Sequence, residues 1–135
     1  MKPNFRAWLK EENKMIEPSD ILSISFKLCE MTPNYLYEFE KEKYDFYDLE
    51  LMRSTGLFDK NDEEVFEGDI LEVTDKHSWL EVVSYSQEKA MFVTEEINRE
   101  FKVPESPLYD LLDSTFLKFK VIGNIYEDPE LLEVE

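Results

Sequence analysis

Residues 51–73, LMRSTGLFDKNDEEVFEGDILEV, carry the densest structural pattern in this chain. β-prone runs on both sides of a polar turn at residues 59–62 predict a hairpin whose second strand is entered through Gly68. Gly56 and Gly68 are two of the only three glycines. Since glycine adopts left-handed conformations that other residues avoid, we expect one in a turn and the other in a bulge that bends a strand into a barrel. Close approach of the backbone to a ligand is the functional alternative.

Short β-prone runs separated by turn residues fill most of the remaining sequence. Strands are predicted at residues 5–10, 15–16, 21–31, 80–85, 90–94 and 116–126. Residues 35–50 mix aromatic with charged side chains, and we expect an irregular or edge segment there. One short helix is expected from Ser106 as N-cap and Pro107 as first helical residue. Many short strands and one helix predict an all-β barrel or roll.

The predicted strand at residues 21–31 alternates, with Leu22, Ile24, Phe26 and Leu28 on one face. It contains Cys29, the only cysteine, so no intrachain disulfide can form. An apolar run of this kind favours a buried, inert thiol over a reactive one. A lone cysteine, no signal-peptide pattern and no run long enough to span a bilayer predict a cytoplasmic protein.

The formal net charge of −17 predicts a strongly acidic surface. Hydrophobic residues make up 42% of the chain, which is enough for a packed core and argues against disorder. An acidic field repels phosphate backbones, so direct binding of DNA or RNA is not expected. A solvated, soluble surface is the simplest interpretation of the charge.

Four separate stretches recur together in a known family. They are FRAW at residues 5–8 with NKMI at 13–16, TGL at 55–57 with DKN at 59–61, EGDI at 67–70, and VIGNIYE at 121–127 with PEL at 129–131. In this order the stretches resemble the YopX family of bacteriophage and prophage proteins. Residues 31–49 and 73–115 carry no such signature. Asp62 departs from the family pattern, which has glycine there; Asn61 and Asp62 still tolerate turn angles, so the hairpin is retained while its turn type stays open.

The resemblance implies a small β fold with an SH3-like C-terminal part. We therefore expect one YopX-like unit over residues 1–135, with an N-terminal β region at 1–50 and an SH3-like barrel core with an acidic tail at 51–135. The family is functionally uncharacterised, so its residues are taken as structural motif positions and not as catalytic or binding groups. These positions are Phe5, Arg6, Trp8, Thr55, Gly56, Leu57, Asp59, Lys60, Asn61, Glu67, Gly68, Asp69, Ile70, Gly123, Asn124 and Tyr126.

No motif in the sequence indicates catalysis, a metal or a cofactor. His77 is the only histidine, and Asp75 and Ser78 beside it suggest a triad only superficially, because adjacent positions do not supply triad geometry. A polar loop is favoured there. The alternation of Asp59, Asn61 and Glu63 resembles a calcium loop but lacks its glycine and spaced glutamate, so a solvated turn is favoured.

The leading functional hypothesis is a non-enzymatic phage accessory protein, an acidic β module that binds a phage or host protein. Trp8, Trp79 and Phe5 are candidates for either core or a contact surface. One alternative is a DNA mimic whose carboxylates occupy a nucleic-acid-binding site. The other is a carboxylate- or metal-dependent hydrolase. Self-association through β edges is a further expectation.

Overall fold

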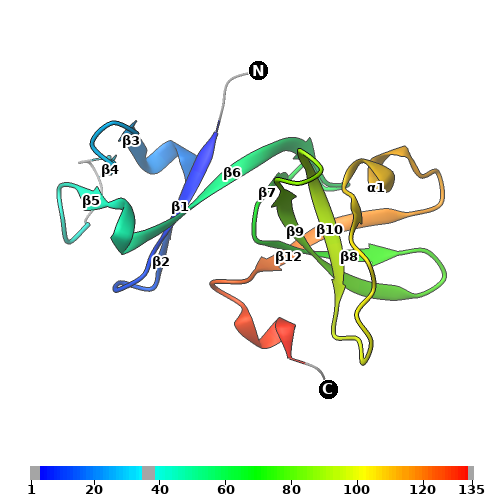
Figure 1. Cartoon of the computed structure of the whole chain (residues 1–135). Helices are drawn as coiled ribbons and strands as arrows, with labels where there is room; N and C mark the ends of the chain where they lie inside the picture. The colour runs from blue at the N-terminus through cyan, green and yellow to red at the C-terminus, as the bar shows by residue number, and fades with distance from the viewer. Residues whose placement is uncertain (1–3, 35–38, 134–135) are drawn as a thin grey trace. The chain divides into compact units, whose positions relative to one another are not determined.

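The computed structural model describes residues 4–34 and 39–133 and is mainly β, with antiparallel sheets and one short α-helix (Figure 1). This confirms the all-β prediction. The chain forms two compact units, unit 1 at Met1–Ser54 and unit 2 at Thr55–Glu135. The boundary falls inside strand β6 (Leu49–Phe58), which pairs with β1 in unit 1 and with β7 in unit 2. No helix within the described ranges is both long and apolar enough to cross a membrane.

Unit 1 is built from two small antiparallel sheets. β1 (Phe5–Leu9) lies between β2 (Lys14–Ile16) and β6, as its alternation predicts, and β4 (Glu30–Pro33) lies between β3 (Ile21–Ser25) and β5 (Tyr44–Asp45). Short 3-10 helices precede β3 (η1, Pro18–Asp20) and β6 (η2, Phe46–Asp48). The apolar core joins both sheets through Ala7, Leu9, Ile16, Met31, Tyr44 and Leu49.

The single strand predicted at residues 21–31 is wrong. The chain reverses after Ser25, and β3 and β4 form a hairpin with Ile24 opposite Met31. Cys29 takes a left-handed conformation with φ of 54°, which closes the turn. The Ser25 hydroxyl accepts a hydrogen bond from the Leu28 N–H at 3.1 Å. The expected burial of Cys29 is wrong too: its side chain is exposed, because it lies in this turn and not in a strand.

Residues 39–50 are short and irregular, in line with the prediction. Within them lie β5, η2 and the start of β6, while residues 35–38 fall outside the described part of the chain. The side chain of Asp45 accepts a hydrogen bond from the Tyr47 N–H at 3.0 Å and so caps η2. The cap lets the chain turn from β5 into β6.

Unit 2 is dominated by a curled five-stranded antiparallel sheet, a half-barrel with the order β11-β10-β9-β8-β12. Its strands are β8 (Asp69–Thr74), β9 (Ser78–Ser86), β10 (Met91–Ile97), β11 (Ser106–Pro107) and β12 (Lys118–Asn124). β7 (Glu64–Phe66) precedes β8, and the 3-10 helix η3 (Pro129–Leu132) follows β12. The core of unit 2 consists of Val65, Leu71, Val73, Val83, Leu108, Leu111 and Phe119.

The predicted helix start is wrong by a few residues. Ser106 and Pro107 form β11 opposite Thr94 and Val93, and helix α1 (Tyr109–Asp113) begins only after Leu108. Ser106 and Pro107, which the capping pattern assigned to the helix, pair with β10 instead. Leu108 and Leu111 are buried in the core of unit 2, whereas Leu112 is exposed.

Candidate functional site

Most family-motif residues of unit 2 connect separate segments of the chain through hydrogen bonds or core contacts. Asp59 is the clearest example. It is only 7% exposed, so the solvated turn expected here is wrong for this side chain. Its Oδ1 accepts hydrogen bonds from the N–H groups of Asn61 at 2.9 Å and Glu63 at 2.8 Å, and its Oδ2 accepts one from Val121 at 2.8 Å. A buried carboxylate is stable when such donors surround it. Asp59 thus joins the β6–β7 turn to β12.

The conformation of the β6–β7 turn shows how Asp62 replaces the glycine of the family pattern. Asp62 has φ of 64° and its N–H donates to the Asp59 carbonyl at 3.0 Å. Asp62 is the one turn residue with positive φ, and that arrangement differs from the Asn-Gly turn, which needs positive φ at both central positions. The hairpin is therefore retained with a different turn.

A second tie surrounds Gly68 and Asn124. Gly68 has φ of 85° in the turn between β7 and β8, and its carbonyl accepts from the Ile125 N–H at 2.9 Å. Asn124 is buried, and its Oδ1 accepts from the N–H groups of Tyr126 at 3.0 Å and Glu127 at 2.8 Å. Asp69 is buried beside this turn and accepts from the Phe66 N–H at 2.8 Å. The hydrogen bonds of Asp69 and Asn124 thus stabilise the loops at this end of β8 and β12.

The remaining motif positions also have structural surroundings. The Thr55 hydroxyl donates to the Val65 carbonyl at 2.8 Å, Gly56 has φ of 78° within β6, and Leu57 packs against the core of unit 2. The Lys60 N–H donates to the Phe119 carbonyl at 3.2 Å, and Ile70 is fully buried. Glu67 precedes Gly68 in its turn. A register shift lies between Val121 and Gly123. A Cβ added at Gly123 would clash with the Asp128 carboxylate.

Phe5, Arg6 and Trp8 lie on β1 in unit 1. Arg6 is buried, and its Nε lies 3.4 Å from the Met52 sulfur. Trp8 is half-buried and pairs in register with Met15 and Glu50. All three residues therefore belong to the sheet that joins β1, β2 and β6.

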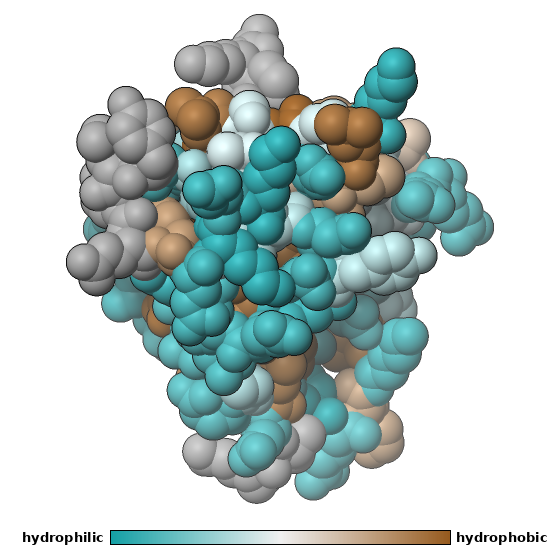
Figure 2. Space-filling model, turned by 90° about the vertical axis from the view of Figure 1, so that its left-hand side faces the viewer, coloured by the Kyte–Doolittle hydropathy of each residue, from teal (hydrophilic) through white to brown (hydrophobic). Residues whose placement is uncertain are grey.

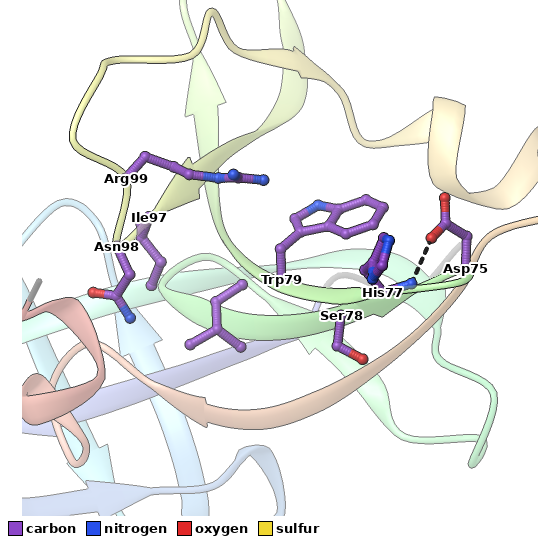
Figure 3. Close-up of a pocket in the computed structure, with 8 residues that line it drawn as sticks. Asp75, His77, Ser78, Trp79, Ile97, Asn98 and Arg99 are labelled. Carbon is purple, nitrogen blue, oxygen red and sulfur yellow. Dashed lines mark hydrogen bonds between the residues drawn. The ribbon is translucent and has the colours of Figure 1, made fainter. Parts of the chain in front are cut away.

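The loop that carries His77 borders a hollow of about 560 Å³ in unit 2. Its lining residues are Asp75, His77, Ser78, Trp79, Leu80, Ile97, Asn98 and Arg99 (Figure 3). Asp75 accepts a hydrogen bond from the backbone N–H of His77 at 2.9 Å, which lowers the pKa of that carboxyl. Ser78 is 3.1 Å from the Thr74 hydroxyl. The observed bonds are those of a polar loop and do not connect Asp75, His77 and Ser78 as a triad.

Two further aspects concern possible ligands. Among the residues that the structure describes, no group of three or more His, Cys, Asp or Glu side chains is placed to hold a metal ion. The Trp79 indole N–H donates to a Glu81 carboxylate oxygen at 2.7 Å, and Glu81 is buried. Trp79 also packs against the core, so it has both a structural contact and a side that lines the hollow.

A group of exposed apolar side chains in unit 1 was not recognised from the sequence. Leu22, Phe26 and Leu28 of the β3–β4 hairpin are 58%, 62% and 62% exposed, and we call these three residues the hairpin patch. The Phe26 ring contacts the rings of Phe5 and Phe46, each with centroids 6.0 Å apart. Alternation alone placed these side chains inward. The turn lacks glycine, asparagine and proline, so no local signal marked the reversal.

A hollow of about 360 Å³ adjoins the patch and is lined by Asn4, Phe5, Pro18, Ile21, Leu22, Ile24 and Phe26. Figure 2 shows hydrophilic side chains over most of one face of the molecule and hydrophobic ones in a few separate places. Exposed apolar groups gathered on one hairpin of a highly charged protein are a typical protein-contact feature.

These observations define a mainly β protein with a half-barrel in its C-terminal unit and an exposed apolar hairpin in its N-terminal unit. A family model described as YopX protein matches residues 4–133, and the chain belongs to the YopX family. The fold is similar to the crystal structure of protein EF1440 from Enterococcus faecalis, with a TM-score of 0.69 and 26% sequence identity. The similarity covers 98% of this chain and 99% of that one. Comparison with curated proteins found no match.

Proposed function

We propose that this chain is a phage or prophage accessory protein that binds another protein in the bacterial cytoplasm and catalyses no reaction. The hairpin patch carries this proposal. Three large apolar side chains more than half exposed to water are costly unless a partner covers them, since burial contributes about 25 cal/mol per Å² of apolar surface.

The construction of the hairpin supports a role as a contact surface. Ile24 and Met31 pair across it, and Met31 is fully buried, so one side of the hairpin is anchored in the core of unit 1. Phe26 is supported by Phe5 and Phe46 without being covered by them. A partner would therefore meet apolar side chains on a supported element, which limits the entropy lost on binding.

A differential pull-down tests the proposal. The tagged protein and its Phe26→Ser and Leu28→Ser variants are incubated with lysates of host and phage-infected cells, with Phe116→Ser as matched control. Phe116 is 84% exposed in unit 2 and forms no part of the hairpin. We expect a partner with wild type and Phe116→Ser and its loss with both hairpin variants, each with an unchanged melting temperature. Recovery of nothing above background by wild type would contradict the proposed function.

The charge distribution favours a second candidate, the DNA mimic. By sequence, unit 2 contains 21 acidic and seven basic residues, a net charge of −14 out of −17 for the chain. Such a concentration suits the basic cleft of a nucleic-acid-binding protein. The assay is competition with DNA for a host nuclease or polymerase at low salt, where DNA mimicry requires displacement of DNA and its absence argues against this candidate.

A further inference from the structure

We infer that the hollow of unit 2 binds an extended, basic segment of a partner protein, with a lysine or arginine side chain seated beside Trp79. This inference rests on the proposed protein-binding function. It adds a second contact surface and the charge class of the partner.

The hollow combines an aromatic ring with oxygen acceptors. Trp79 lies on β9 opposite Val73 of β8, and Leu80 pairs with Ile97 of β10; Trp79, Leu80 and Ile97 all line the hollow. Asp75 lies in the β8–β9 connection, Ser78 begins β9, and Asn98 and Arg99 follow β10. An indole face attracts a cation through the ring quadrupole, and carboxylate and amide oxygens accept the cation's hydrogen bonds.

The charges behind the hollow are those that attract a cation. Glu81 and Glu96 face each other in register across β9 and β10. Glu81 is buried against the Trp79 indole N–H, and Glu96 lies 3.0 Å from Arg99. Glu96 thus forms an ion pair with Arg99, and the Arg99 side chain extends toward the Trp79 ring (Figure 3). The chain's own arginine indicates which chemical group this place accommodates.

A second hollow continues the first. It measures about 380 Å³, shares Asn98 and Arg99 with the first, and is completed by Glu100, Phe101 and Val103. Phe101 is 80% exposed there. An extended segment that crosses both hollows meets acidic and aromatic groups first and an apolar ring next. Basic residues alternating with apolar ones match that order, and the net charge of −14 on this unit attracts them from a distance.

The test uses a short fluorescein-labelled peptide that alternates lysine with leucine, titrated into the full-length protein and followed by anisotropy. We expect saturable binding that weakens with salt, and at least about tenfold weaker binding by Phe101→Ser and by Asp75→Asn. Phe116→Ser should bind like wild type, and a peptide with glutamate in place of lysine should not bind. In ¹⁵N-labelled protein the largest shift changes should include the Trp79 indole N–H and residues 98–103.

Absence of binding by the lysine peptide at low salt overturns the inference. The inference also fails if neither Phe101→Ser nor Asp75→Asn weakens binding of the lysine peptide. The peptide would then respond only to the overall charge of the protein. Either result leaves the proposed function intact if the hairpin-dependent partner is still recovered. The proposed function fails separately if wild type captures no partner.

Discussion

At the scale of single residues, the buried polar side chains carry the family signature. Asp59, Asp69 and Asn124 are each buried and each accepts hydrogen bonds from backbone N–H groups of a turn. All three residues lie within the motifs recognised in the sequence, yet a solvated turn was predicted for Asp59. The third hydrogen-bond donor to Asp59 is the N–H of Val121, which lies 62 positions away, and no local sequence pattern indicates such a contact.

Asp59→Ala should destabilise the protein by about 2–4 kcal/mol, because three backbone donors lose their charged acceptor. Asp59→Asn retains one acceptor oxygen and should cost less. Lys60→Ala is the control, since it removes an exposed side chain and keeps the backbone bond to Phe119. Urea unfolding measures these differences, and an Asp59→Ala variant as stable as Lys60→Ala would show that the tie contributes nothing.

Asp62→Gly should stabilise the protein by about 0.5–1 kcal/mol. Its φ of 64° strains any residue with a Cβ, and glycine removes that strain. Asp62→Asn separates the two effects of the change, because it removes the charge while keeping a side chain. Thermal unfolding should rank glycine above asparagine; equal melting temperatures would assign the gain to charge alone.

The raised pKa of Tyr44 predicts that the protein loses stability at high pH. Burial raises the pKa of Tyr44 to about 12, and its hydrogen bond to the Glu12 carboxylate acts in the same direction. The folded-state pKa exceeds the unfolded value of about 10, so the stabilisation is complete below pH 10 and is lost as the pH rises toward 12. Over this range wild type should lose about 2 kcal/mol more than Tyr44→Phe.

Tyr47→Phe is the matched control for this titration, because Tyr47 is 90% exposed. It should keep the wild-type pH dependence in urea unfolding. An identical slope for Tyr44→Phe and wild type between pH 10 and 12 would contradict the role of Tyr44.

At the scale of elements, alternation located β1, β2, β9, β10 and β12 but failed where a turn has no turn residues. The run ILSISFKLCEM contains no glycine, asparagine or proline, so its period of two appeared unbroken. The reversal instead uses a left-handed Cys29, and the Phe46 N–H donates to the Cys29 carbonyl at 2.9 Å. This tertiary contact decides the hairpin, and with it the exposure of the hairpin patch.

The Cys29 thiol should react readily in the native protein. It is exposed in the β3–β4 turn, where it donates a hydrogen bond to the Phe26 carbonyl oxygen at 3.6 Å. Alkylation by iodoacetamide, followed by mass spectrometry, should proceed at a rate comparable to that of the urea-unfolded protein. A thiol that reacts only after unfolding would contradict the exposed turn and support a buried Cys29.

At the scale of the whole molecule, the two units differ in charge. Unit 1 has 11 acidic and eight basic residues by sequence, a net charge of −3, whereas unit 2 has −14. The composition gives the net charge of the whole chain and does not indicate how the charge is divided between the units. The apolar hairpin patch therefore lies in the less charged unit, where a partner can cover it without strong repulsion or steering, and the more charged unit offers a surface for basic groups.

The measurement that tests the protein-binding account most directly is the alkylation rate of Cys29 in the isolated complex. Cys29 follows Leu28 in the hairpin and is the only cysteine, so its modification reports on this surface alone. With the captured partner bound, the rate should fall by at least about tenfold relative to the free protein and recover when the partner is removed. A thiol that reacts at the free-protein rate while the partner remains bound would show that the partner does not cover the hairpin patch.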